Sequence, residues 1–405
     1  MRTLGLLTIG SVLATSVLVG PAAAQSAPEP ATRAAEIAAA QSEKAQALEP
    51  YEPTRGEALV IKAEEFLNNT FRYWHPYLTP AYQGGGFAPG AGYTFYTSPY
   101  TTLDLRGSYS IRAYKRAEAV FSAPRLLSRR ASLEIAGGWR EATQVAFFGL
   151  GSDSRKDDRT NFGFEQPYAS ASFTVRPARK VLTLEAGAEW TQWKTRAASG
   201  GRSPSIETRY TADDLPGLGA DVTYLHAQGK VALDWRPEPG YARRGTYLGV
   251  TAHEYRDTDN RYGFRQMDYD VVQHVPILRE AWVVSLHGQL TQTDAKHGQD
   301  VPYFLRPWLG GGTTIRGINS FRYRDRNALL LQAEWRIMVN RFMDTAVFYD
   351  AGQVAAKVGQ FGTRSMAGSY GFGVRVHTLV NTAMRIDLAK SREGFAVVFA
   401  SGAAF

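Results

Sequence analysis

The chain has 405 residues, no cysteine and a formal charge of +8, from 46 Lys and Arg against 38 Asp and Glu. Without cysteine, a disulfide framework and thiolate chemistry are excluded. Aromatic residues make up 12% of the chain, yet beyond the N-terminal stretch no apolar run reaches the roughly 18 residues of a membrane-spanning helix. A polar, aromatic-rich chain is more typical of a transmembrane β-barrel than of a soluble enzyme.

Residues 1–24 have the pattern of a secretory signal peptide. Arg2 supplies the positive start, the stretch to Val19 is mostly apolar, and three alanines at 22–24 form a cleavage site. We therefore expect an exported protein. Its basic excess favours anionic lipid headgroups or a lumen that attracts anions, or is only a solvated basic surface. No nucleic-acid partner is expected in that compartment.

Residues 25–83 are expected to form a periplasmic leader. Up to Pro53 the leader is rich in Ala, Glu, Gln and Pro, which predicts a flexible or partly helical segment. A helix is predicted over 54–67, because Thr54 and Glu57 have capping-box spacing and the apolar residues fall on one face. This helix would plug or dock against the rest of the protein, or act only as a linker.

From residue 84 to residue 405 the hydrophobic period is two. Apolar and polar residues alternate over 168–176, 225–236 and 384–388. A soluble sandwich also alternates, but it buries its apolar face and solvates its polar face. Charges that recur on the inner face of successive strands favour a polar lumen with lipid outside. We predict an all-β fold, a transmembrane antiparallel β-barrel over 84–405.

The strand count follows from the two ends of this segment. Fifteen candidate strands fit, the first at 84–97 and the last at 394–405. A barrel with both ends in the periplasm needs an even number of strands. Counting back from Phe405 places the long connections on one side, which is the extracellular side of such a barrel. A strand is therefore missing before residue 143, and we predict sixteen.

The connection 294–326 is unusual for a loop that only faces water. It contains Gly310-Gly311-Gly312, followed closely by Ile315-Arg316-Gly317. Consecutive glycines permit positive φ and close backbone contacts, so we expect the loop to fold back and pack. The spacing of Gly312 and Gly317 matches a phosphate loop, but Ile318 stands where lysine is required. Nucleotide binding is therefore rejected.

Several short motifs follow one another toward the C-terminus. In chain order they are Leu309-Gly310-Gly311, Ile315-Arg316-Gly317, Glu334-Trp335-Arg336, Phe348-Tyr349-Asp350-Ala351-Gly352, Gly371-Phe372-Gly373-Val374-Arg375 and Arg385-Ile386-Asp387. The series resembles the signature of the BamA/TamA superfamily of outer-membrane assembly and translocation barrels, also called the bacterial surface antigen family. The resemblance implies a sixteen-stranded barrel whose sixth extracellular loop enters the lumen. There, acidic groups of the wall hold its Arg-Gly tip.

The matching tip in this chain is Arg316-Gly317. A guanidinium drawn into a confined lumen needs carboxylates, because it does not lose its proton. We predict a loop latch made of Arg316, Gly317, Glu334, Arg336, Asp350 and Gly352. We also predict three lumen-wall residues, Arg375, Arg385 and Asp387. The alternative is that these residues fix the loop and do nothing else.

The two ends of the chain carry further expectations. Residues 25–83 are too few for a complete POTRA module, so the chain resembles POTRA-less members of the family. Phe405 resembles the C-terminal barrel-targeting signal, which makes the protein a client of the barrel-assembly machinery. The last strand would form a seam with a first strand weakened by the glycines of 84–86 and 90–92. Such glycines serve either lateral opening or tight curvature.

Enzymatic chemistry is not expected. There is no G-x-S-x-G elbow and no H-E-x-x-H motif among the seven histidines, and neither a metal nor another cofactor is expected. We expect an outer-membrane protein that assists insertion or translocation of proteins or lipids. Its partners would include outer-membrane lipids such as lipopolysaccharide. The alternative is a passive pore or a structural barrel of the envelope.

Overall fold

In the computed structural model, the described residues are 33–46, 73–178, 181–278 and 280–405. The predicted signal peptide and the predicted helix over 54–67 lie outside them. The chain divides into two units, Met1–Glu65 and Phe66–Phe405, which are treated separately. In the described part of the first unit, the helix α1 spans Arg33–Gln46 within the predicted leader. Among the described residues, no helix is long and apolar enough to cross a membrane.

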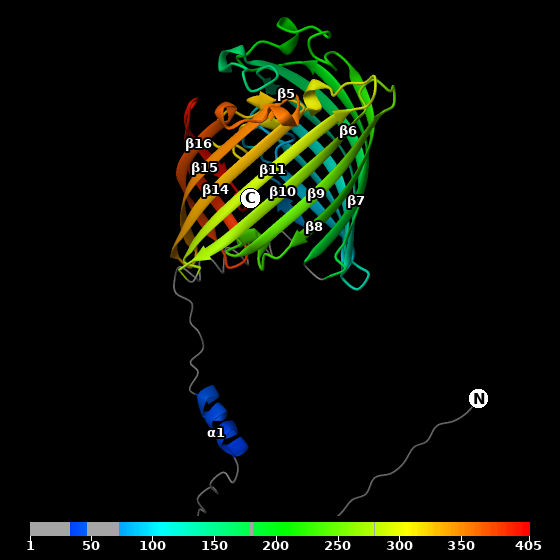
Figure 1. Ribbon diagram of the computed structural model, residues 1–405. Helices are drawn as coiled ribbons and strands as arrows, with labels where there is room; N and C mark the ends of the chain where they lie inside the picture. The colour runs from blue at the N-terminus through cyan, green and yellow to red at the C-terminus, as the bar shows by residue number, and fades with distance from the viewer. Residues whose placement is uncertain (1–32, 47–72, 179–180, 279) are drawn as a thin grey trace, which may run out of the picture. The chain divides into compact units, whose positions relative to one another are not determined.

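The second unit is built on a 16-stranded antiparallel sheet in which each strand pairs with the next along the chain. The tilted strands curl into a barrel (Figure 1). The strands of this sheet are β1 Trp74–Pro76, β2 Gly90–Ser98, β3 Thr101–Tyr109, β4 Lys115–Leu126, β5 Ala131–Phe147, β6 Thr160–Val175, β7 Leu182–Ala197, β8 Asp221–Asp234, β9 Gly245–Asp257, β10 Phe264–Ile277, β11 Trp282–Ala295, β14 Asn327–Asn340, β15 Met343–Ala355, β16 Ala367–His377, β17 Thr382–Ser391 and β18 Gly394–Ala400. The predicted fold class is confirmed.

The strand count is confirmed, and the missing strand is now located. It is β1, which lies before the expected barrel start at residue 84 and spans only three residues. A strand this short shows no alternation, which is why the pattern missed it. The last strand ends at Ala400 instead of Phe405. The glycines of 84–86 lie in the β1–β2 connection, and the first strand is therefore not glycine-rich.

The wall is apolar outside and polar inside. Leu225, Val231 and Phe399 expose 55%, 54% and 71% of their surface, whereas Glu334 and Asp387 expose 3% and 0%. This inverts the pattern of a soluble protein, because lipid covers the outer face of a membrane barrel and its lumen is polar.

The long connections gather at one end of the barrel, here called the loop end (Figure 1). They include 148–159, 198–220, 296–326 and 356–366. The connection 296–326 contains a second, two-stranded sheet made of β12, Trp308–Leu309, and β13, Tyr323–Arg324. The short 3-10 helices are η1 Lys156–Asp158, η2 Ile206–Thr208, η3 Pro239–Tyr241, η4 Tyr303–Leu305, η5 Val358–Gln360 and η6 Thr363–Ser365.

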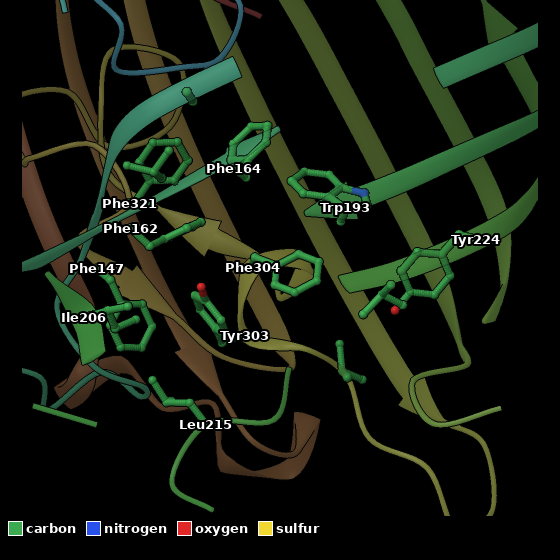
Figure 2. Packing of buried hydrophobic residues seen from close by; sticks show 14 of the residues in the cluster. Phe147, Phe162, Phe164, Trp193, Ile206, Leu215, Tyr224, Tyr303, Phe304 and Phe321 are labelled. Atoms are coloured by element: carbon green, nitrogen blue, oxygen red, sulfur yellow. The ribbon is translucent and has the colours of Figure 1, made fainter. Parts of the chain in front are cut away.

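An apolar core lies inside the barrel toward the loop end (Figure 2). Strand ends and loop residues build it together: Phe162 meets the ring of Tyr303 at 5.0 Å, and Trp193 stacks on Phe304 at 5.2 Å between ring centroids. All four side chains are at most 5% exposed. The connection 296–326 is therefore anchored in the lumen by burial of apolar surface, which is the dominant favourable contribution to packing.

Candidate functional site

The connection 296–326 folds back on itself before it reaches the wall. Its β12–β13 pairing joins Leu309 to Tyr323. Gly310 and Gly311 between these strands have φ of +112° and +100°, a region that residues other than glycine rarely adopt. A Cβ atom at Gly310 would overlap the carbonyl oxygen of Asn319. The glycines therefore close a tight turn that presents Arg316.

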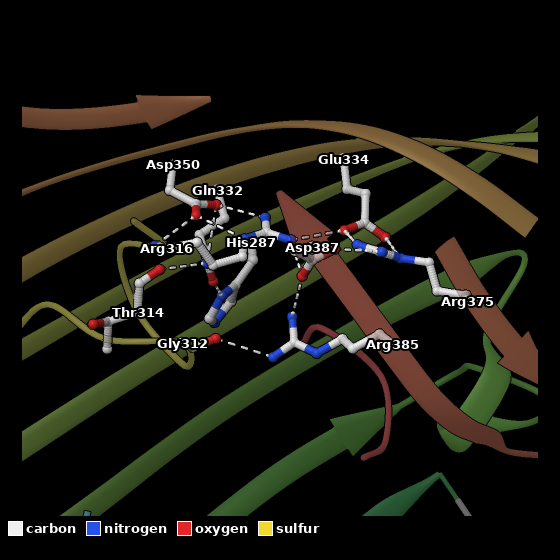
Figure 3. Close-up of polar contacts among 10 residues, drawn as sticks. All are labelled: His287, Gly312, Thr314, Arg316, Gln332, Glu334, Asp350, Arg375, Arg385 and Asp387. Carbon is white, nitrogen blue, oxygen red and sulfur yellow. Dashed lines mark hydrogen bonds and ion pairs between the residues drawn. The ribbon is translucent and has the colours of Figure 1, made fainter. Parts of the chain in front are cut away.

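Arg316 is the centre of the site (Figure 3). Its side chain is fully buried and binds both carboxylate oxygens of Asp350, with Nη2–Oδ1 at 2.7 Å and Nε–Oδ2 at 2.8 Å. Its backbone N–H also donates to Asp350, at 3.0 Å. The Nη1 group lies 3.2 Å from Glu334 Oε2 and 3.3 Å from Asp387 Oδ2. One loop guanidinium is thus bound by carboxylates of β14, β15 and β17.

Two wall arginines complete the cluster. Arg375 of β16 bridges Glu334 at 2.6 Å and Asp387 at 2.5 Å. Arg385 of β17 contacts Asp387 at 3.3 Å and donates to the Gly312 carbonyl oxygen at 3.0 Å. Three arginines therefore face three carboxylates, and none of the six residues is more than 3% exposed. The balance of charge matters because an unpaired buried ion is strongly destabilising.

Charge also decides the protonation of the loop tip. Burial by itself lowers the pKa of the Arg316 guanidinium, but the hydrogen bonds and charge of Asp350, followed by the charges of Glu334 and Asp387, outweigh burial and raise that pKa. The tip is a permanent cation. The charge that the loop contributes to the cluster is therefore present at every pH near neutrality.

Uncharged groups of the wall shape the same site. The Cζ atom of Arg316 lies 3.5 Å from the centroid of the Phe348 ring, a cation–π contact. Gln332 donates to the Thr314 carbonyl oxygen at 2.7 Å and to Asp350 at 3.1 Å. Ser391 donates to the Gly317 carbonyl oxygen at 2.7 Å. Phe348, Gln332 and Ser391 were not predicted as site residues, although Phe348 belongs to the Phe348-Tyr349-Asp350-Ala351-Gly352 motif.

Three glycines make room for this arrangement. Gly317 has φ of +79°, and a Cβ there would lie 2.9 Å from Ala389. At Gly352, a Cβ would lie 2.8 Å from Leu309, a loop residue that packs on β15. At Gly373, a Cβ would overlap the Oδ1 atom of Asp387, which Arg375 binds. Gly373 was also missed, because its requirement appears only when the ion pair passes over it.

Arg336 does not take the predicted place beside Arg316. It faces the lumen from the same strand as Glu334, but it donates to the carbonyl oxygen of Ala242 in the β8–β9 connection. A period of two predicts the face of a strand and leaves the position along it open. Arg336 follows Glu334 by two positions on β14, so it lies about 7 Å further along the strand. This places it closer to the other end of the barrel than the Arg316 cluster.

A second contact ties the same loop to the β17–β18 turn. Glu393 accepts from Arg322 Nε at 2.5 Å and from the backbone N–H of Asn319 at 3.2 Å. Arg322 also donates to the hydroxyl and carbonyl oxygens of Ser154 in the β5–β6 connection, at 2.8 and 2.7 Å. Phe405 lies elsewhere, with its ring stacked at 5.1 Å from that of His287 on β11.

The barrel retains space next to the loop. A cavity of 610 Å³ is lined by loop residues such as Phe304 and Leu309 and by wall residues that include Arg140, Glu189 and Asp268. Its lining combines aromatic rings with both signs of charge. The lumen is therefore narrowed but not filled by the connection 296–326.

A family model, the Omp85 superfamily domain, matches residues 96–393. The chain belongs to the Omp85 superfamily. BamA from Haemophilus ducreyi lacking POTRA domains 1–3 has a similar solved structure, with a TM-score of 0.58 and 14% sequence identity over 82% of this chain and 68% of that chain. CdiB from Acinetobacter baumannii matches with a TM-score of 0.47 and 10% identity over 77% of this chain and 56% of that chain. None of the curated proteins is similar enough in sequence to match.

The family match confirms the resemblance drawn from the motifs. The match also covers the strands before residue 309, where the sequence showed only the general alternating pattern. At 14% identity, the likeness to the Haemophilus ducreyi barrel concerns the fold alone. Omp85 proteins are outer-membrane β-barrels, and this chain is one of them.

Proposed function

We propose that this Omp85 barrel assists the insertion or translocation of proteins, or of lipids, at the outer membrane, with the connection 296–326 as its gate. The observation that carries the proposal is the binding of Arg316 by carboxylates of three wall strands. A barrel that served only as a tube or an envelope support has no need for a charged loop tip inside its lumen. Because one fold can serve many functions, the proposal rests on this site and not on the fold.

The cluster has the properties of a latch. Removing one member leaves a buried charge without its partner, which is strongly unfavourable. Releasing the loop as a unit hydrates Arg316 and the wall ions together, and Arg375 and Arg385 remain beside Glu334 and Asp387. We therefore expect the loop to exchange between a bound and a released arrangement, as a switching element requires. In this latch, Arg316 is the cation that moves with the loop, and the carboxylates of the wall are the fixed groups that bind it.

Further expectations about orientation, export and chemistry complete the proposal. The loop end faces the cell exterior, with the short turns on the periplasmic side. The signal peptide at 1–24 directs export, and Phe405 is part of the signal by which the assembly machinery recognises the chain. The substrate crosses or enters the membrane without covalent chemistry.

A reversible cross-link tests the gate. An ideal Cβ at Gly312 lies 4.0 Å from the Cβ of Val398 on β18, within the range of a disulfide, and the chain has no other cysteine. In Gly312→Cys/Val398→Cys, oxidation should fix the loop to the last strand and abolish assembly or translocation in cells. A reductant should restore it. Each single-cysteine variant under the same oxidant is the matched control.

Depletion of the protein identifies its class of substrate. Loss of other barrels, or of one defined exported protein, from the outer-membrane proteome is the expected result. An unchanged proteome together with altered uptake of small solutes would contradict the proposal and favour the passive pore. Full activity of the oxidised double-cysteine protein would contradict the role of the loop as a gate, but it would not contradict the proposed function in insertion or translocation.

A further inference from the structure

The outer, lipid-facing wall carries a groove across β5 to β9. It has a volume of 570 Å³ and a mostly apolar lining. Its floor is a cross-strand row in which Ile135 pairs with Ala171, Ala171 with Ala188, Ala188 with Ala227, and Ala227 with Glu254. The three alanines lie between larger side chains, so the wall is hollowed along this row.

Bulky residues flank the groove. Trp190 and Leu225, neighbours in the register, line it and expose 43% and 55% of their surface, while Ile135 at its end exposes 46%. In a membrane, lipid acyl chains cover such a face. The groove therefore has the polarity and the walls that an acyl chain needs.

A second, polar hollow adjoins the groove at the loop end of β9 to β11. It has a volume of 690 Å³, and Glu254 and Arg256 line both hollows. Three cations surround Glu254: Lys296 at 2.6 Å, Arg265 at 2.8 Å and Arg256 at 3.8 Å. Asp257 and Asp294 are the other carboxylates that line this hollow, so three cations lie beside three carboxylates.

The cations have free hydrogen-bonding capacity. The side chains of Arg256 and Arg265 are 74% and 73% exposed, and each contacts Glu254 through Nε. A guanidinium offers five donors in a planar fork that fits phosphate oxygens. Asn260 and Gln299 line the same hollow and offer amide groups to hydroxyls of a headgroup.

We propose that the joined hollows bind a phosphorylated glycolipid of the outer leaflet, with one acyl chain in the groove and a phosphate against Arg256, Arg265 and Lys296. The order of the two parts, apolar toward the centre of the wall and cationic toward the loop end, matches the order of chain and headgroup in that leaflet. The inference rests on the proposed orientation of the loop end. It goes beyond the proposed gate, because the site lies on β5–β11 and the latch on β14–β17.

Lipid titration tests the site. The full barrel in a nonionic detergent is titrated with purified lipid A, and native mass spectrometry counts the bound lipid. We expect one retained lipid A. Filling the groove with Ala188→Phe, or removing cations with Arg265→Ala/Lys296→Ala, should weaken binding by on the order of ten-fold, since each basic residue near a charged surface contributes several-fold.

Matched variants separate these effects from general damage. Ala333→Phe changes an outward alanine on β14, and Lys115→Ala removes a lysine that pairs with Glu141 on β4–β5 at 2.7 Å. Both should bind lipid A like the parent, and all four proteins should show the heat-modifiable gel mobility of a folded barrel. Equal binding by Ala188→Phe and the parent would overturn the proposal.

Further ligands identify what is recognised. Lipid A without phosphates should bind at least ten-fold more weakly than lipid A. Inorganic phosphate at millimolar concentration should not displace it. Displacement by phosphate alone, or equal binding of phosphatidylglycerol, would overturn the assignment to a glycolipid. The oxidised Gly312→Cys/Val398→Cys protein should retain lipid A. Binding of lipid A therefore tests the lipid site independently of the gate.

Discussion

At the scale of single residues, the geometry of Arg316 explains why this position needs arginine. The guanidinium binds two oxygens of Asp350 along one edge and stacks its face on Phe348. Lysine has one charged nitrogen and no planar face, so it cannot make both contacts. The side chain that fits is the one whose donors are already arranged in a plane.

We predict that Arg316→Ala folds but loosens the tip of the loop, while the apolar packing of Tyr303 and Phe304 remains. Removing one partner of a buried ion cluster destabilises by about 3–5 kcal/mol, which chemical denaturation of the refolded barrel measures. Limited proteolysis should then cut within 296–326 in the folded state. The control is Arg209→Ala, whose pair with Asp158 is 2.8 Å long but 46% and 31% exposed and contributes at most about 1 kcal/mol. Protease resistance equal to that of the parent would exclude the latch.

A second prediction concerns Gly373, whose hydrogen atom faces the Arg375–Asp387 pair. Gly373→Ala should destabilise the barrel by about 1–3 kcal/mol, because overpacking a tight site displaces its neighbours. Gly229→Ala on β8 is the matched control, since a Cβ there meets nothing within 4 Å. Denaturation midpoints compare the two. Equal midpoints would show that the ion pair tolerates displacement.

At the scale of elements, the sheet is uneven around the barrel. β1 spans three residues, whereas β10 and β11 span fourteen each. The side chain of His75 on β1 contacts Asp104 on β3 at 2.8 Å, passing over Gly92. The first strand therefore depends on few ladder hydrogen bonds, on this polar contact and on the packing of the Trp74 ring against Tyr93 of β2, at 5.0 Å between centroids.

We expect this unevenness to appear in amide hydrogen exchange. The amides of β1 should exchange roughly ten-fold or more faster than those of β10, because segments with few cooperative hydrogen bonds open locally at low free energy. Asp104→Asn should accelerate exchange in β1 and leave β10 unchanged. Uniform protection of both strands would mean that the first strand is held by more than its ladder.

At the scale of the whole molecule, the apolar core at the loop end argues against a passive pore. Phe162, Trp193, Tyr303 and Phe304 pack inside the barrel where an open channel would run. We predict a small conductance in planar bilayers for the parent. Replacing 302–324 by a flexible Gly-Ser linker should raise it severalfold, and shortening 358–365, which lies outside this core, should not. A large conductance of the parent protein would contradict this prediction and support the alternative of a passive pore.

Some residues of the site could be predicted from the sequence and others could not. Asp350 and Glu334 were predicted because the family resemblance implies acidic groups around the Arg-Gly tip, and both residues lie on the polar face of the two strands that follow the loop. Arg336 shares that face but lies at another height. Phe348 looks like any aromatic of the wall, and only the folded loop places it under a guanidinium.

The sequence by itself determined the barrel, its sixteen strands and the family, because alternation, length and ordered motifs are local properties of the chain. The tertiary structure decided which charges meet. Asp387, Arg375 and Arg385 join the Arg316 cluster because the stagger of β14 to β17 brings them to one height, and stagger depends on pairing across the whole sheet. The stagger of β6 to β9 likewise aligns three alanines with Glu254 into a groove that no single strand contains.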